Sequence, residues 1–133
     1  MNAEIATTAD VLPGHFARAL LDNLTSWGAV TTIVVQAGCV FEFKGNFPKG
    51  QLGNGYWNLD GPVPGFHGHI NLAVIDHVAF QDRPHQGRQA LALVFVDKKA
   101  QTIFKVFLGR DHTGALDASQ VEKFRNLQRV LAL

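Results

Sequence analysis

Two histidines, His67 and His69, stand on either side of a glycine in the stretch 66–70, which reads Phe-His-Gly-His-Ile. In an extended strand, alternate side chains point to the same face and lie about 6.5–7 Å apart. Both imidazoles would then face one space and could contact one metal ion or metal-containing ligand. Because they are neighbours on a single strand, they cannot bind opposite sides of a metal held in a flat macrocycle. The alternative is that both are surface or hydrogen-bonded side chains.

The other four histidines are weaker candidates for chemistry. His15 and His112 lie beside predicted helix and loop ends, and His85 lies in a predicted turn, so we expect all three to be solvated. His77 is the one obvious third ligand if the pair above holds a small divalent ion such as zinc, which usually takes three or four ligands. The sequence contains no Gly-x-x-x-x-Gly-Lys loop, no Gly-x-Ser-x-Gly elbow and no His-Glu-x-x-His pair, so the stronger catalytic signatures are absent.

Ring side chains are abundant, with 10 phenylalanines, 2 tryptophans and 1 tyrosine in the chain. A sheet face lined with rings could bind a flat apolar ligand, although the same rings also suit an ordinary core. Carboxylates at the rim of such a ligand would be bound best by arginine or lysine. The candidates are Arg83, Arg88, Lys105 and Arg110, each of which is also consistent with a solvated surface charge.

A sheet must position these side chains, because most of the chain has the β-branched and alternating patterns of strands. The glycine- and proline-rich segment 45–65 is predicted as loops around one strand, and residues 82–87 are predicted as another loop. The strongest hairpin joins the last two strands. The predicted strands cover residues 30–36, 39–44, 56–59, 66–70, 72–80, 90–96 and 102–108.

Helices are predicted at both ends of this sheet. Apolar residues at three- and four-residue spacings predict helices over residues 14–26 and 119–133. Ser119 and Glu122 fit a capping box at the start of the second helix. The expected fold is therefore α+β, with a central antiparallel sheet of roughly six to eight strands flanked by an N-terminal and a C-terminal helix.

Length and composition limit the possible classes of protein. With 133 residues, of which 47% are hydrophobic and 17% charged, the chain suits one globular domain. We expect residues 13–133 to form that domain and residues 1–12 to form a flexible arm. A net charge of +1 argues against a nucleic-acid binder. Cys39 is the single cysteine and no apolar run is long enough to span a membrane, so the expected location is the cytoplasm.

Several segments occur together in an order that resembles a known family. They lie between residues 11 and 131, so they cover nearly the whole chain. On these segments the chain resembles the cytosolic haem-utilisation carrier family of the HutX/ChuX type. The segments are Trp27-Gly-Ala-Val-Thr-Thr32, Phe41-Glu-Phe43, Gly55-Tyr-Trp-Asn-Leu59, Gly68-His-Ile70, His77-Val-Ala79 and Phe104-Lys-Val-Phe-Leu-Gly-Arg-Asp111.

The resemblance implies an antiparallel sheet in a split-barrel-like arrangement, related in fold to the HemS/ChuS haem proteins. It also implies a homodimer with paired sheets, and haem binding for transfer inside the cell. The family's haem-ligand histidine falls on His69, which we expect to bind the iron. A second family histidine falls on Val35, which has no donor atom, and His67 is an additional histidine. The family's further N-terminal helical segment finds no counterpart in this sequence.

The expected function is an intracellular haem carrier in haem uptake and iron utilisation, and not an enzyme. The expected haem contacts are His69, His67, Arg110 and Arg83, and the expected protein partners are a haem donor or a haem-degrading acceptor. Two alternatives remain open. A haem-degrading enzyme also uses one axial histidine with an open opposite side. A non-haem metal-binding or structural dimer would use His67 and His69 for a small ion.

Overall fold

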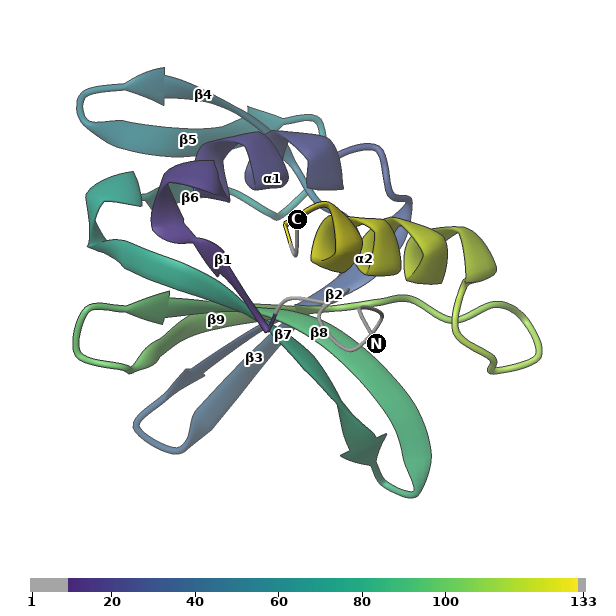
Figure 1. The fold of residues 1–133 in the computed structure, drawn as a ribbon. Coiled ribbons are helices and arrows are strands. Elements are labelled where there is room, and N and C mark those ends of the chain that lie inside the picture. The colour runs from purple at the N-terminus through teal and green to yellow at the C-terminus, as the bar shows by residue number, and fades with distance from the viewer. Residues whose placement is uncertain (1–9, 132–133) are drawn as a thin grey trace, which may run out of the picture.

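The computed structural model describes residues 10–131, which form strands and helices in an α+β arrangement (Figure 1). The strands are β1 Val11–Pro13, β2 Ala29–Gln36, β3 Cys39–Asn46, β4 Lys49–Gly53, β5 Tyr56–Gly61, β6 Gly68–Ile70, β7 Ile75–His85, β8 Arg88–Asp97 and β9 Thr102–Phe107. Six of them form one sheet in the order β1-β7-β8-β9-β2-β3, and three form a second sheet in the order β4-β5-β6. All neighbouring strands are antiparallel, which confirms the predicted sheet type.

Both predicted helices are present, with different ends. The first is a 3-10 turn at Gly14–Phe16 followed by the α-helix α1 Ala17–Leu24. The second, α2 Ala118–Leu131, is capped by Asp117, whose carboxylate accepts a hydrogen bond from the backbone N–H of Gln120 at 3.1 Å. The predicted capping box at Ser119 and Glu122 is therefore wrong, and residues 132–133 of the predicted helix lie outside the described residues. None of the helices in the described part of the chain is long and apolar enough to cross a membrane.

One face of the six-stranded sheet carries the main core. Alternate residues of the central strand β8 point toward the helices, and both helices lie on this same side of the sheet in Figure 1. The three-stranded sheet contributes Trp57 and Leu59 to the same core. The fully buried members of the main core that come from β8 and the helices are Leu93, Phe95, Leu21, Leu24 and Phe124, each 0% exposed.

The opposite face of the sheet carries a second, smaller apolar cluster. It consists of Ala92, Val94 and Val96 from β8, with Ala79 and Phe107 packed against them. Charged side chains surround this cluster. The Lys105 ammonium donates a hydrogen bond to Gln81 at 2.9 Å, and burial, aided by the nearby Arg83 guanidinium, lowers the pKa of Lys105. We call this surface the open face.

Two predicted loops are partly strands. Segment 45–65 holds the hairpin of β4 and β5, whose two-residue turn, Asn54-Gly55, has φ values of 53° and 83°. Positive φ at both positions is typical of a type I′ turn, and Asn-Gly is its preferred sequence. β7 continues to His85 through the predicted loop 82–87. Pro84 is tolerated there because β1 pairs only with residues 77–79, which leaves the end of β7 at an edge of the sheet.

The remaining boundaries shift by a few residues. The strand predicted over 66–70 contains only Gly68–Ile70, and the strand predicted over 72–80 begins at Ile75 after a 3-10 turn at Leu72–Val74. Leu12, the last residue of the predicted arm, pairs with Val78 in the sheet and is 2% exposed. Of the predicted arm, residues 1–9 lie outside the described residues.

Candidate functional site

A hollow of about 390 Å³ is lined by residues from both sheets, and we call it the histidine hollow. Strand β6 and the residues on either side of it contribute His67, His69 and Asn71, while the six-stranded sheet contributes Thr32. These four residues are the polar part of the lining. The rest is apolar: Val34, Phe43, Phe47, Leu59, Phe66, Gly68, Ile70, Val74, Ile103 and Phe104. Its size lies within the range of small-molecule sites, about 300–1,000 Å³.

Aromatic rings form one wall of this hollow. Phe43 on β3 stacks on Phe66, with centroids 4.7 Å apart and ring planes at 25°. Phe47 meets Phe66 edge-on at 5.7 Å and is 2% exposed, so the buried core fixes the inner end of the wall. The outer end is accessible, because Phe43 is 37% exposed. Such a wall provides the flat apolar contact that a planar ligand needs.

His69 lies on β6, directly opposite Asn58 on β5. Its Nδ1 is 2.7 Å from the Asn58 Oδ1, and the edge of Tyr56 meets its ring at 6.2 Å and 73°. The imidazole is exposed. His67 precedes the strand, is also exposed and lines the same hollow. Both histidines are thus among the residues that line the hollow, but only His69 is on a strand. Its imidazole lies with Asn58 on the face of β5 and β6 opposite Leu59 and Ile70, so it stands at the outer edge of the hollow.

Thr32 carries an unusual polar atom in the wall of the hollow. The residue is 3% exposed, and within residues 10–131 its hydroxyl has no hydrogen-bond partner. A buried hydroxyl without a partner costs about 1–3 kcal/mol. It is thus available to a group that enters the hollow, which suits a ligand or a ligand-bound water and adds to the fit of the site.

The predicted cations lie elsewhere. Arg110 donates hydrogen bonds to the backbone oxygens of Gln89 at 2.6 Å and Gly114 at 3.1 Å, and Arg88 also donates to Gly114. Arg83 pairs with Ala90 in the sheet, which places it on the open face. No arginine or lysine is among the residues that line the histidine hollow. Strand alternation directs Arg83 and Arg88 to the open face, whereas Arg110 follows β9 and is held by the backbone oxygens named above.

Val35, which occupies the position of the second histidine in the resemblance, also lies away from the hollow. Its neighbour Val34 lines the hollow, and successive strand residues point to opposite faces. Val35 is 56% exposed. A histidine at this position would therefore be directed to the open face and could not meet His69 across a ligand within one protomer.

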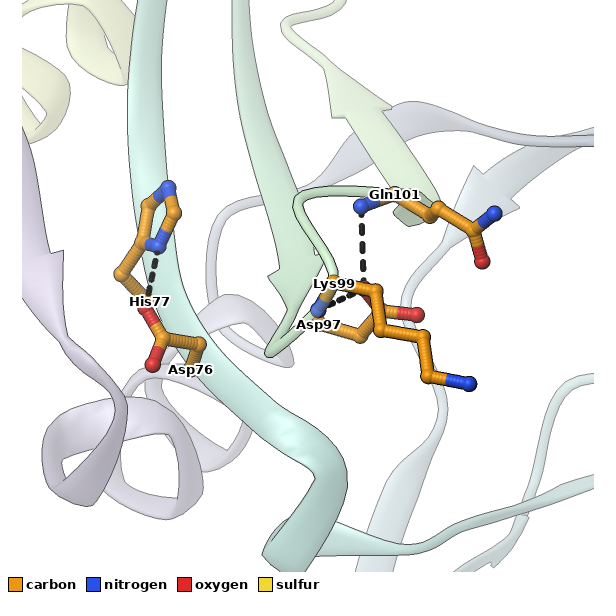
Figure 2. Close-up of polar contacts among 5 residues, drawn as sticks. All are labelled: Asp76, His77, Asp97, Lys99 and Gln101. Atoms are coloured by element: carbon orange, nitrogen blue, oxygen red, sulfur yellow. Dashed lines mark hydrogen bonds and ion pairs between the residues drawn. The ribbon is translucent and has the colours of Figure 1, made fainter.

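His77 does not complete a metal site with the pair. Its Nδ1 is 2.8 Å from the carboxylate of Asp76, and the two lie on β7 next to the turn between β8 and β9 (Figure 2). The carboxylate of Asp97 holds that turn by accepting hydrogen bonds from the backbone N–H groups of Lys99 and Gln101, each at 2.9 Å. Among the described residues, no three His, Cys, Asp or Glu side chains are grouped so that they could hold a metal ion.

Two functional candidates, Asn58 and Thr32, do not follow from the sequence reasoning. Asn58 can be recognised as a neighbour of His69 only when β5 is paired with β6. That pairing depends on the hairpin that brings β4 beside β5. The Asn54-Gly55 turn signal within segment 45–65 could have revealed the hairpin. Thr32 lies in a strand where threonine is ordinary, so its type gives no signal.

Comparison with known proteins places this arrangement in a family. The family model for haem utilisation ChuX/HutX matches residues 11–127. The chain is 40% identical over 119 residues to the intracellular heme transport protein HutX of Vibrio cholerae, covering 90% of this chain and 62% of HutX. The chain thus spans less than two thirds of the curated relative that it matches.

Solved structures agree with this relationship. The heme binding protein ChuX is 34% identical, with a TM-score of 0.85 over 93% of this chain and 78% of ChuX. The heme degrading enzyme ChuS of Escherichia coli O157:H7 is 17% identical, with a TM-score of 0.74 over 92% of this chain and 36% of ChuS, which shows a shared fold alone. By sequence and by structure, the chain belongs to the ChuX/HutX haem-utilisation family.

Proposed function

We propose that this protein binds haem and carries it within the cytoplasm for haem uptake and iron utilisation. The observation that carries the proposal is that His69, an exposed residue of β6, borders an apolar, ring-lined hollow. Imidazole is a common haem-iron ligand, and the rings offer the apolar contact that a porphyrin requires. The heme transport protein HutX and the heme binding protein ChuX, to which the chain is similar, support the same function.

In this proposal His69 is the iron ligand and His67 is a second contact at the same hollow. Phe43 and Phe66 contact the macrocycle, and Thr32 offers its free hydroxyl to a polar group at the iron or on the ligand. The two arginines expected from the sequence, Arg83 and Arg110, have no part in the contact that one protomer makes. Binding by a single exposed histidine suits a carrier, since the cargo must be released to a haem-degrading acceptor or another partner.

Titration of the purified protein with haemin tests haem binding. We expect a Soret band that shifts from the free-haemin position and saturates at a fixed ratio of haemin to protein. An unaltered haemin spectrum would overturn the proposal. His85→Ala, which changes an exposed histidine on the open face, is the matched control and should leave the titration unchanged.

Carriage is separated from degradation by exposing the haem complex to a reductant and oxygen. A carrier keeps its Soret band until an apo-haem protein is added, and then transfers the haem to it. Steady loss of the Soret band with release of a linear tetrapyrrole would instead establish a haem-degrading enzyme, which the shared fold with ChuS keeps as the second candidate.

We also propose that the protein is a homodimer in which a second copy covers the open face. Val35 and Val40 face each other across β2 and β3 on this face and are 56% and 58% exposed. Covering them with the equivalent surface of a second copy removes their apolar area from water. Sedimentation velocity should show a dimer for the natural sequence and a monomer for Val35→Arg. A monomer at all concentrations for the natural sequence would contradict the dimer and leave haem binding untouched.

A further inference from the structure

The side chain of Asn58 is held from two directions. On one side its Oδ1 lies 2.7 Å from the Nδ1 of His69. On the other side its amide nitrogen donates to backbone carbonyl oxygens of Gly53 at 3.1 Å, Gln51 at 3.3 Å and Tyr56 at 3.5 Å. The residue is half-buried, so these contacts replace water over much of its amide.

This surrounding fixes which way the amide points. Carbonyl oxygens can only accept hydrogen bonds, so the three backbone oxygens require the NH₂ group of Asn58 to face them. A reversed amide would place its oxygen against those three acceptors and leave two buried donors poorly matched. The oxygen of Asn58 must therefore face His69, where it can only accept.

The orientation of Asn58 in turn sets the protonation of His69. Because Oδ1 accepts, the Nδ1 of the imidazole must carry the hydrogen and donate it. In the neutral ring the other nitrogen, Nε2, then keeps its lone pair. A ligating histidine needs that state, since metal binding uses the unprotonated nitrogen while the other N–H is held by an acceptor.

The local fold explains why the acceptors converge on Asn58. The two-residue turn at Asn54 and Gly55 sets the register in which Gln51 faces Asn58 and Gly53 faces Tyr56. Gly53 leaves room for the amide, because a Cβ at that position would lie 3.1 Å from the Asn58 nitrogen. The β4–β5 hairpin thus directs one amide oxygen toward one imidazole.

We propose that Asn58 is a positioning residue that holds His69 in the Nδ1–H tautomer, so that Nε2 is ready to bind haem iron before haem arrives. This inference rests on the proposed function for its purpose, but its physical content concerns the protein without ligand. Asn58 acts through His69 and makes no contact with iron itself. Its loss should therefore change the state of the ring first and the affinity for haem second.

The direct test is nitrogen NMR of the full chain, without haem, labelled in its histidines and kept in mildly alkaline buffer. We expect the His69 signals of the natural sequence to show a protonated Nδ1 and an unprotonated Nε2. Asn58→Ala should shift them toward the Nε2–H tautomer or a mixture, because the acceptor at Nδ1 is lost. Asn126→Ala, which changes an asparagine on α2, is the control and should leave His69 unchanged.

Haem titration gives a second readout. Loss of such an outer partner typically lowers metal affinity by about 10–100-fold, so Asn58→Ala should weaken haemin binding by about tenfold or more. Two results would overturn the inference even if haem binds. One is an Nε2–H tautomer in the natural sequence, and the other is an Nδ1–H tautomer that persists in Asn58→Ala. Failure of the natural sequence to bind haemin would overturn the proposed function, while the tautomer result would stand by itself.

Discussion

The two faces of the six-stranded sheet carry hollows of similar size and opposite chemistry. The histidine hollow, about 390 Å³, is apolar with two imidazoles, whereas the hollow on the open face, about 420 Å³, is lined by charged side chains such as Lys44 and Arg110. Neighbouring residues of the same strands supply both surfaces, because successive side chains alternate. Strand alternation therefore puts Lys44 on the face opposite its neighbour Phe43 and separates the charged lining from the histidine hollow within one protomer.

The largest contrast between the faces should be in stability. Phe95 is 0% exposed beneath the helices, whereas its neighbour Val94 is 7% exposed on the open face. Phe95→Ala should lower the free energy of unfolding by about 3–5 kcal/mol through lost burial and the cavity it leaves. Val94→Ala should cost clearly less. Urea denaturation of both variants measures the difference, and equal losses would mean that both faces are packed alike.

Substitution of Thr32 should change the free energy of unfolding by a smaller amount and in the opposite direction. Its hydroxyl is buried without a partner in the described part of the chain, so Thr32→Val removes a group that has lost its water. We expect the unfolding free energy without haem to rise by about 1 kcal/mol. A decrease measured by the same denaturation experiment would show that the hydroxyl already has a partner in the free protein.

The separation of the two histidines from the arginines and lysines predicts the affinity of the proposed carrier for a modified haem. Haemin dimethyl ester lacks charged carboxylates, and no arginine or lysine lines the histidine hollow. Its affinity should therefore lie within about threefold of that of haemin, because no charge-assisted contact is lost. A loss of tenfold or more in competitive titration would show that a cation reaches the carboxylates, and Arg110→Ala in the same experiment would show whether it is Arg110.

The smallest expected effect concerns an ion pair on the helix-covered side. The Arg125 guanidinium lies 2.8 Å from Asp82, and this hydrogen bond lowers the pKa of Asp82. A lowered folded-state pKa means that the stabilisation is present above the unfolded-state pKa and disappears as pH falls through the folded-state value. Since both side chains are partly exposed, Asp82→Asn should cost about 0.5 kcal/mol or less at neutral pH.

That cost should shrink as the pH falls below the unfolded-state pKa of about 4 and vanish once the folded-state carboxylate is protonated as well. Denaturation of Asp82→Asn and the natural sequence at neutral pH and at successively lower pH measures the change. A cost that stays constant with pH would assign the effect to packing of the asparagine and not to the charge of Asp82.

Local patterns predict much of this fold but not its pairings. The β8–β9 hairpin follows from two apolar strands and a short polar connection, and the helices follow from apolar spacing. The second sheet is missed because glycine and proline dominate its strands. The hydrogen bonds that form β4 and β5 come from the backbone, and side-chain patterns indicate them only through the Asn54-Gly55 turn.

The candidate site is likewise only partly predictable from the sequence. His69 is indicated by its strand and by the family resemblance, and the structure places it at an apolar hollow with His67. The predicted arginines are misplaced because sequence alone does not show which face of the sheet their strands turn toward the histidines. Asn58 depends on a cross-strand register, which no single segment specifies.

Haemin titration of His69→Ala against His85→Ala tests the central claim most directly, since it changes one imidazole on each side of the sheet. The account predicts that His69→Ala binds haemin at least about tenfold more weakly and loses the shifted Soret band, while His85→Ala behaves as the natural sequence. An unchanged affinity and spectrum in His69→Ala would contradict the account and remove this imidazole from the iron.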